Sequence, residues 1–216
     1  PYYGNRAHLS EIPDFVPQAF LAIEDRRFYE HEGVDRMAVL RAIIANMRAG
    51  ETVQGGSTIS QQLARNLFLT PRQTVNRKLR EMVLASRIER RLTKDEILEL
   101  YLNRVYLGDQ AYGVDAAARR FFGKAATELT LAEAAMLAGL PKAPSRSAPT
   151  ESLERATARQ HVVLEAMVAA GFITPEQRDD LKRIDSAEMQ RRVGDPHLHN
   201  RLTPREQDVL QCLADG

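Results

Sequence analysis

Apolar residues recur at helical spacing along most of the chain. The first stripe consists of Phe15, Val16, Ala19, Phe20 and Ile23. It predicts a helix, and the proline just before it suits a first helical turn. Similar stripes predict further helices over residues 36–49, 59–68, 72–88, 95–102, 114–122, 131–139 and 153–170. Sustained alternation of apolar and polar residues, which would indicate strands, is lacking. The pattern therefore predicts a mainly α protein with a single core.

Capping residues mark the ends of several of these helices. Thr93 and Thr130 each stand three residues before a glutamate, Glu96 and Glu133, and this spacing predicts capping boxes. Residues 103–113 form a polar link punctuated by glycines. Residues 142–149, rich in proline, serine and alanine, are expected to form an extended strap.

The helix predicted over residues 59–68 has an unusual polar face. Its buried face is expected to consist of Ile59, Leu63, Leu67 and Phe68. Its other side carries three amides and a cation, which are Gln61, Gln62, Arg65 and Asn66. These residues either line a polar groove or form an ordinary amide-rich solvent face. Residues 55–58 (GGST) bring bare backbone close to a neighbour, but they are a weak phosphate signal without the lysine of a P-loop.

Titratable residues gather where the first helix ends. Glu24 follows the apolar stripe directly, and partial desolvation there would raise its pKa toward that of a general base. Taken alone, the charged run from Glu24 to Asp35 fits a solvated helix end better, with pairs between neighbouring charges. Lys78 and Glu81 present a similar choice, because residues three apart on a helix often simply pair with each other.

Composition limits the classes of function. The 216 residues are 44% hydrophobic, which suits a soluble core, and 30 Lys and Arg residues against 29 Asp and Glu residues give a net charge of +1. Nucleic acid is therefore not an expected partner, and any anion site must be local. The single cysteine, Cys212, excludes an internal disulfide. No stretch reads as a signal peptide or a membrane span, so any membrane anchor is expected upstream of Pro1.

Five stretches acquire meaning from their order along the chain. They are residues 24–33 (EDRRFYEHEG), 55–63 (GGSTISQQL), 77–81 (RKLRE), 96–103 (EILELYLN) and 129–142 (LTLAEAAMLAGLPK). Together they closely resemble the peptidoglycan glycosyltransferase, or transglycosylase, domain of class A penicillin-binding proteins and monofunctional transglycosylases. The resemblance covers residues 10–180 and is specific because it needs all the motifs in one order.

The resemblance implies a lysozyme-like helical fold with a catalytic cleft. It also implies an enzyme that polymerises lipid II into glycan strands on the outer, periplasmic side of the bacterial cytoplasmic membrane. By motif position, Glu24 matches the general base that deprotonates the 4-hydroxyl of the acceptor's N-acetylglucosamine. That oxygen attacks the anomeric carbon of the donor's N-acetylmuramic acid with inversion and expels undecaprenyl pyrophosphate. Glu81 matches a second essential carboxylate near the pyrophosphate, with a divalent cation, Mg²⁺ or Mn²⁺, as a candidate cofactor.

The other predicted site residues would bind the substrate. Charge-assisted hydrogen bonds to the leaving pyrophosphate are expected from four cations, Arg65, Arg72, Arg77 and Lys78. Sugar and phosphate oxygens are expected to contact Asp25, Ser57, Gln61, Gln62 and Asn66. Two positions depart from the family pattern: Arg65 stands where lysine is usual, and the strap lacks the common Asn-Pro.

The end of the chain differs from the family. Residues 1–183 are predicted to form the glycosyltransferase domain, and residues 184–216 a tail of uncertain role. The segment 200–216 resembles the first helix of a LuxR-type helix-turn-helix domain but stops before a recognition helix. An ordinary amphipathic helix is the favoured interpretation of this segment.

Two other functions share parts of the pattern. A glycan-cleaving lytic transglycosylase or lysozyme has the fold and a catalytic glutamate, but it needs no cationic cluster for a pyrophosphate. A catalytically inactive scaffold would be expected to lack Glu24 or Glu81, and both are present. The expected partners are lipid II, the growing glycan chain, the membrane surface and other cell-wall synthesis proteins.

The motifs and their surroundings predict three structural features. Glu24 and Glu81 should line one cleft. The segment 48–55 should be mobile without ligand, because it has little apolar surface to bury. Phe15 and Phe20 should either be buried, which the pattern favours, or contact the membrane.

Overall fold

The computed structural model of the chain describes residues 2–37, 39–40, 47, 56–68 and 75–183. Its elements in chain order are β1 (Tyr2–Tyr3), α1 (Phe15–Glu24), η1 (Phe28–Glu30), α3 (Ile59–Phe68), α4 (Val75–Glu89), α5 (Lys94–Leu102), β2 (Ala111–Tyr112), α6 (Val114–Phe122), η2 (Ala126–Glu128), α7 (Leu131–Gly139), η3 (Leu140–Lys142), α8 (Pro144–Ser147) and α9 (Leu153–Ala169). Residues 175–183 are also helical. The predicted mainly helical fold is confirmed.

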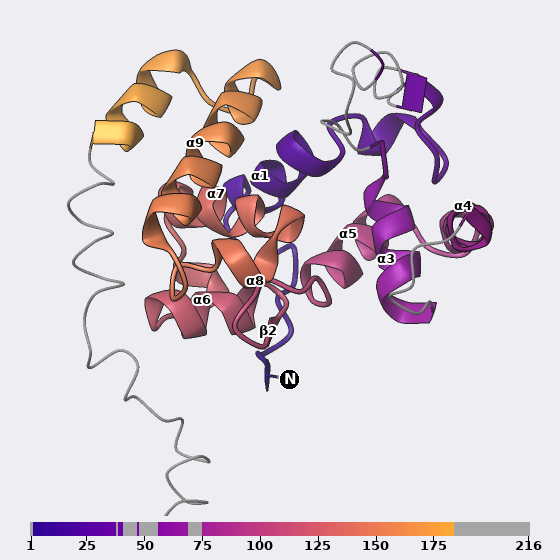
Figure 1. Cartoon of the computed structure of the whole chain (residues 1–216), viewed down its shortest axis with the longest axis horizontal. Coiled ribbons are helices and arrows are strands. Elements are labelled where there is room, and N and C mark those ends of the chain that lie inside the picture. The colour runs from indigo at the N-terminus through magenta and orange to yellow at the C-terminus, as the bar shows by residue number, and fades with distance from the viewer. Residues whose placement is uncertain (1, 38, 41–46, 48–55, 69–74, 184–216) are drawn as a thin grey trace, which may run out of the picture.

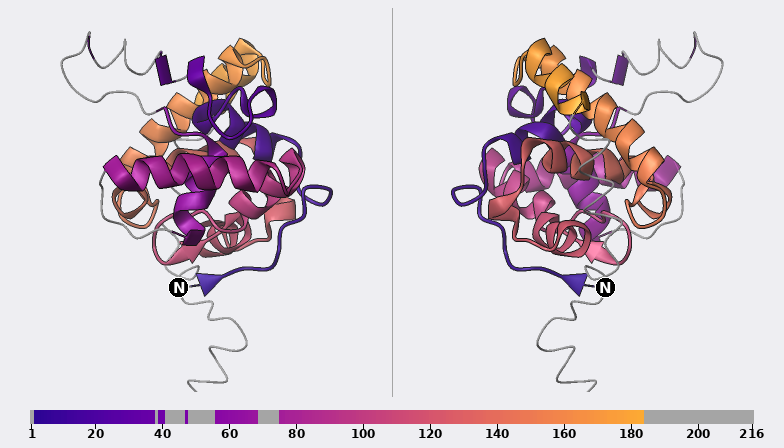
Figure 2. Two further views of the ribbon diagram at one scale, coloured as in Figure 1. Left: turned by 90° about the vertical axis from the view of Figure 1, so that its right-hand side faces the viewer. Right: turned by 90° about the vertical axis from the view of Figure 1, so that its left-hand side faces the viewer.

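The helices form two groups that meet at α1, α3 and α5 (Figure 1). In one group α1, α7 and α9 pack against one another, and in the other α3 packs against both α4 and α5. Seen from the side, α4 runs lengthwise along the outer surface of the second group (Figure 2, left). The alanines of α7, including Ala134, Ala135 and Ala138, are fully buried. Their small side chains allow α1 and α9 to approach α7 closely.

Capping begins two of the core helices as the sequence predicts. The Thr93 hydroxyl accepts a hydrogen bond from the Glu96 N–H, and the Glu96 carboxylate accepts one from the Thr93 N–H. Thr130 and Glu133 repeat this arrangement at the start of α7. Each box satisfies N–H groups that a helix start leaves without a partner inside the helix.

The N-terminal segment crosses the end of α5 and pairs with the link that precedes α6. Arg6 contacts Glu99 at 2.7 Å, and Ala7 exchanges two hydrogen bonds with the Asn103 side chain. The two-residue strand β1 pairs in parallel with β2, so the link over residues 103–113 contains a short strand that the sequence pattern does not predict.

The buried face of α3 differs from the prediction. Gln61 and Gln62 are buried, at 1% and 7% exposure, whereas Leu67 and Phe68 are exposed at 41% and 60%. The prediction of a buried Leu67 and Phe68 was therefore wrong, and of the two alternatives for the amides, an ordinary solvent face is excluded for Gln61 and Gln62. Only the first part of α3 is enclosed by neighbouring helices, and the amides there find polar partners.

Two further expectations are settled by the packing. Phe20 is fully buried and Phe15 packs against the core, so burial is confirmed for the first helix. The expected extended strap over residues 142–149 is wrong, because η3 and α8 lie there. Pro141 and Pro144 occupy early positions of these helices, where a missing N–H costs nothing.

Segment 48–55, which the sequence predicts to be mobile, lies outside the described residues. Within the described part, no helix combines the length and apolarity needed to cross a membrane.

Candidate active site

Glu24 is the last residue of α1, and the residue as a whole is partly exposed. Its Oε2 accepts a hydrogen bond of 2.7 Å from Nε2 of Gln62 on α3. Burial raises the pKa of Glu24 above its ordinary value, while the Gln62 hydrogen bond and the positive charges of Arg159 and Arg65 oppose that rise. A carboxyl group with a raised pKa accepts a proton more readily, as a general base must.

Two residues beside Glu24 were not among the predicted site residues. Tyr101 on α5 is fully buried and donates a hydrogen bond of 3.2 Å to Oε1 of Gln62. Arg159 on α9 donates a hydrogen bond from Nε to the carbonyl of Gly139 at 3.2 Å, and its charge acts on Glu24. Tyr101 lies in the EILELYLN motif, which offered a signal, but the pattern of the last long helix offered none for Arg159. Only the packing of α9 against α1 brings it to the site.

A second polar cluster surrounds Lys78 on α4. Its Nζ lies 2.6 Å from Oγ of Ser57, 3.0 Å from Oε1 of Gln61 and 3.1 Å from Oε2 of Glu81. These contacts match the three N–H donors of an ammonium group. Glu81 is only 1% exposed, and Nε of Arg77 lies 3.5 Å from its Oε1. Lys78 and Glu81 therefore do pair with each other, as residues three apart on a helix can. Lys78 also contacts Ser57 and Gln61, so the ion pair is part of a larger polar cluster.

The two carboxyl groups are linked through α3. Gln62 contacts Glu24, and its neighbour Gln61 contacts Lys78, which holds Glu81. Two residues distant in the sequence thus approach the same turn of one helix, Glu24 from α1 and Glu81 from α4. The expected common cleft stays a prediction, supported by this connection.

Asp25 is engaged by groups of the protein itself. The residue is 7% exposed, and its Oδ2 accepts a hydrogen bond of 2.9 Å from the backbone N–H of Ile59, the first residue of α3. Nε2 of His31 lies 3.0 Å from both carboxylate oxygens. Asp25 therefore fastens the start of α3 to the end of α1, next to Glu24.

The remaining predicted site residues are less buried or lie outside the described part of the chain. Asn66 is exposed and Arg65 is partly exposed. The charge of Arg65 acts on Glu24, so this cation is on the Glu24 side of α3 rather than in the Lys78 cluster. Arg72 lies outside the described residues.

The expected divalent cation finds no fitting donor set in this region. Among the described residues, His, Cys, Asp and Glu side chains form no group of three or more that could hold a metal ion. Glu81, the candidate ligand, faces Lys78 and Arg77. A carboxylate already paired with two cations does not fit a metal site.

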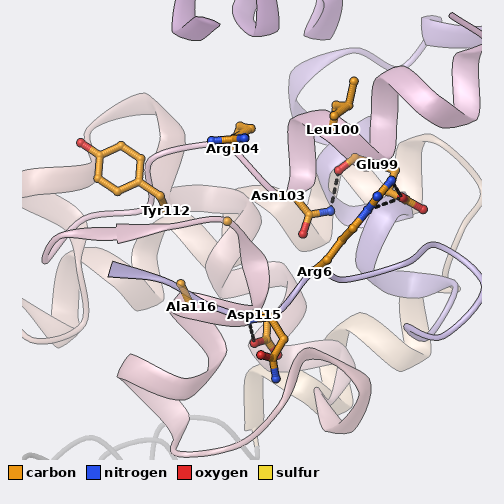
Figure 3. Close-up of a pocket in the computed structure, with 11 residues that line it drawn as sticks. Arg6, Glu99, Leu100, Asn103, Arg104, Tyr112, Asp115 and Ala116 are labelled. Carbon is orange, nitrogen blue, oxygen red and sulfur yellow. Dashed lines mark hydrogen bonds and ion pairs between the residues drawn. The ribbon is translucent and has the colours of Figure 1, made fainter. Parts of the chain in front are cut away.

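A cavity of about 300 Å³ lies elsewhere, between the N-terminal segment, the end of α5 and the start of α6 (Figure 3). Its lining includes Arg6, Glu99, Asn103, Tyr112 and Asp115. The predicted site residues are not part of this lining. Glu99 and Asp115 both hold the N-terminal segment, through Arg6 and through the N–H of Asn5.

Comparison with known proteins agrees with the motif order. Residues 3–168 match the family described as transglycosylase. The chain belongs to this transglycosylase family. It is 55% identical to penicillin-binding protein 1A of Escherichia coli over 174 residues, which are 81% of this chain and 20% of that protein. It is 51% identical over 171 residues to a putative transglycosylase of Cupriavidus necator, covering 79% of this chain and 74% of that protein.

A solved structure shows the same relationship. The crystal structure of penicillin-binding protein 1A from Haemophilus influenzae matches with a TM-score of 0.50 and 28% identity, over 90% of this chain and 22% of that one. This transglycosylase chain thus spans about a fifth of the length of the penicillin-binding proteins it matches.

Proposed function

We propose that this transglycosylase polymerises lipid II into glycan strands, with Glu24 as the general base. The observation that carries the proposal is the Glu24 carboxyl group itself. Its burial raises its pKa, the residue as a whole is still partly exposed, and Gln62 donates one hydrogen bond to Oε2. Among the described residues only Gln62 is hydrogen-bonded to it, so Oε1 can accept the acceptor hydroxyl's proton.

Proton removal is the step that Glu24 performs. As its Oε1 takes the proton of the acceptor's 4-hydroxyl, the oxygen attacks the donor's anomeric carbon from the face opposite the leaving group. The C–O bond to the pyrophosphate breaks, and the configuration at that carbon inverts. The positive charges of Arg159 and Arg65 lower the pKa of Glu24 against the effect of burial, and so favour the ionised form that acts as the base.

The Lys78 cluster is the proposed place of the leaving pyrophosphate. Negative charge grows on the pyrophosphate as it departs, and fixed cations lower the energy of that transition state. Lys78 is held by three acceptors, and a phosphate oxygen would take the place of one of them, such as the Ser57 hydroxyl. Glu81 then keeps Lys78 and Arg77 oriented while the ligand exchanges.

The location and partners follow from the substrate. Lipid II is anchored in the membrane by its undecaprenyl chain, so we propose that the domain works at the outer, periplasmic face of the cytoplasmic membrane. Other cell-wall synthesis proteins stay predicted partners. A glycan-cleaving activity is the weaker alternative, because a sugar leaving group needs no counterpart to Lys78 and Arg77.

The proposal predicts that Glu24→Gln abolishes polymerisation and leaves the fold intact. The amide keeps the size of the side chain but cannot accept a proton, and loss of a general base costs roughly 10²- to 10⁴-fold in rate. The measurement is the glycan polymer formed from purified lipid II, separated from unreacted lipid by gel electrophoresis, with thermal melting as the folding control.

Glu151→Gln is the matched control, because Glu151 is an exposed glutamate just before α9. It should polymerise lipid II like the wild type. Near-wild-type turnover by Glu24→Gln would remove Glu24 from the mechanism. Release of soluble sugars from preformed glycan, without polymer from lipid II, would instead favour the cleaving enzyme.

A further inference from the structure

The Tyr101 hydroxyl is buried in the interior of the protein, next to the proposed base but not in contact with it. The side chain is 0% exposed, and its ring packs edge-on against Phe20 of α1 at a centroid distance of 6.2 Å. The hydroxyl donates to Oε1 of Gln62 at 3.2 Å. A buried hydroxyl at this place therefore has a polar partner on α3, the helix that carries the amide bound to Glu24.

The direction of this hydrogen bond decides how the Gln62 amide faces. An amide has a carbonyl at one end and an NH₂ group at the other. With its carbonyl turned to Tyr101, its NH₂ group lies 2.7 Å from Oε2 of Glu24. If the amide turned over, its carbonyl oxygen would face the carboxylate of Glu24, and two acceptors would oppose each other.

The tyrosine is well suited to hold the amide in one orientation. Burial, followed by the nearby charge of Glu24, raises the pKa of Tyr101 well above its ordinary value, so the hydroxyl stays protonated and donates. The side chain is also locked by packing, because α5 is buried at this point and Phe20 covers the ring. Phenylalanine would fill nearly the same space without the hydroxyl.

We propose that Tyr101 is a positioning residue that acts on Glu24 through Gln62, by holding the amide so that its N–H points at the carboxylate. The inference rests on the proposed function, in which Glu24 is the base. The hydroxyl, the amide and the carboxylate form one chain across α5, α3 and α1. Its effect is to favour the ionised form of Glu24, which is the form that can remove a proton.

The charges that face Glu24 are Arg159 from α9, Arg65 from α3 and Asp25 beside it. They remain in place when the tyrosine hydroxyl is removed. The hydrogen bond from Gln62 lowers the pKa of Glu24 against the effect of burial. Loss of the tyrosine hydroxyl therefore weakens the hydrogen bond from Gln62 to Glu24. Because that bond lowers the pKa of Glu24, the pKa rises further when it is weakened.

The test is Tyr101→Phe, assayed for polymer formation from lipid II across pH 4.5 to 8.5. The acidic limb of the rate profile should move to higher pH by roughly half to one unit, which is the size of the net contribution of one hydrogen bond between neutral groups. The rate at high pH, where Glu24 is ionised in both proteins, should fall much less. Tyr106→Phe is the matched control: this half-buried tyrosine stacks on Tyr112, away from Glu24, and its removal should leave the limb unchanged.

A second variant and a second readout keep the inference testable. Gln62→Met removes the amide and should move the acidic limb in the same direction. Adding Tyr101→Phe to it should cause no additional movement, because the hydroxyl acts only through the amide. Two separate, additive shifts would overturn the inference, and so would an unmoved limb in either single variant.

The second readout needs no substrate. The melting temperatures of the wild type and the Glu24→Gln variant are measured as a function of pH, and the pH at which their difference changes reports the pKa of Glu24. When Tyr101→Phe is introduced into both proteins, this change should occur at higher pH. If wild type makes no polymer, the proposed function fails while this measurement still tests Tyr101. If wild type makes polymer and neither pH dependence moves, the function stands and the inference fails.

Discussion

The surroundings of Glu24 disfavour the charged form of its carboxyl group. Its pKa is raised by burial from an ordinary value of about 4.5 and lowered only in part by the Gln62 hydrogen bond and two arginines. A raised pKa means that the folded protein holds the proton more tightly than the unfolded chain does. Stability therefore falls as pH rises from about 4.5 through the folded-state pKa, and it stays lower at neutral pH. Such a cost is common where a residue serves chemistry rather than folding.

This sign predicts that Glu24→Gln is more stable than the wild type at neutral pH. The amide cannot ionise, so it avoids the cost of a buried carboxylate. The melting temperature of the variant should exceed that of the wild type at pH 7, and the gap should close toward pH 4, where the wild type is also uncharged. Differential scanning fluorimetry over this pH range measures the gap. A gap that stays constant or widens toward acid would contradict the assigned pKa shift.

At the scale of the elements, the site depends on how α3 is held at its first turn. The Asp25 carboxylate binds the N–H of Ile59, and the adjacent amides of Gln61 and Gln62 reach in different directions. One end of α3 is thus packed among α1, α4 and α5, while its last residues are exposed.

Glycine turns provide a direct test at the element scale. Gly113 begins α6 with φ +88° and ψ 161°, and a Cβ added there would lie 2.8 Å from the carbonyl oxygen of Asn103. Gly171 has φ +75° after α9, with no atom within 4 Å of the added Cβ. Gly171→Ala should cost about 1 kcal/mol from backbone strain alone. Gly113→Ala should cost about 3 kcal/mol or more, because strain and a clash with rigid backbone act together.

Urea unfolding of the two alanine variants gives these free energies. The wild type and both variants should share one m-value if each unfolds in one step. Equal losses at the two positions would contradict the close packing of the α5–α6 turn, since only Gly113 touches other backbone.

At the scale of the whole molecule, the proposed site residues come from both helix groups. Glu24 and Arg159 belong to the α1, α7 and α9 group, whereas Gln62, Lys78 and Glu81 belong to the α3, α4 and α5 group. The match to the transglycosylase family ends at residue 168. Residues 184–216, which the sequence predicts to be a tail, lie outside the described residues.

Removal of residues 184–216 should leave polymerisation of lipid II largely unchanged. Each predicted site residue precedes this segment, and the family match ends well before it. Polymer formation and thermal melting of the 1–183 protein are the measurements. A shorter protein ending at residue 150 is the negative control, because it lacks α9 with Arg159 and its packing against α1 and α7. A folded 1–183 protein without activity would give the tail a role in catalysis.

Local chemistry was enough for the sequence to predict where two of the core helices begin. The threonine–glutamate spacing at Thr93 and Thr130 predicts capping boxes, and both are present, because each box is complete within four residues. The alanine-rich stretch of α7 likewise predicts a core helix, since small side chains favour close packing wherever the helix lies. The order of the motifs indicated the transglycosylase family before any geometry was known.

Tertiary structure decided what periodicity cannot encode. The sequence leaves open whether Gln61 and Gln62 line a groove or face solvent. They are buried, because Glu24, Tyr101 and Lys78 supply their hydrogen bonds from three other helices. Leu67 and Phe68 look like core residues but lie where α3 is no longer enclosed. A side chain's burial depends on partners that are far away in the chain. The raised pKa of Glu24, the approach of Arg159 and the direction of the Gln62 amide all arise from such partners, so only the folded chain determines them.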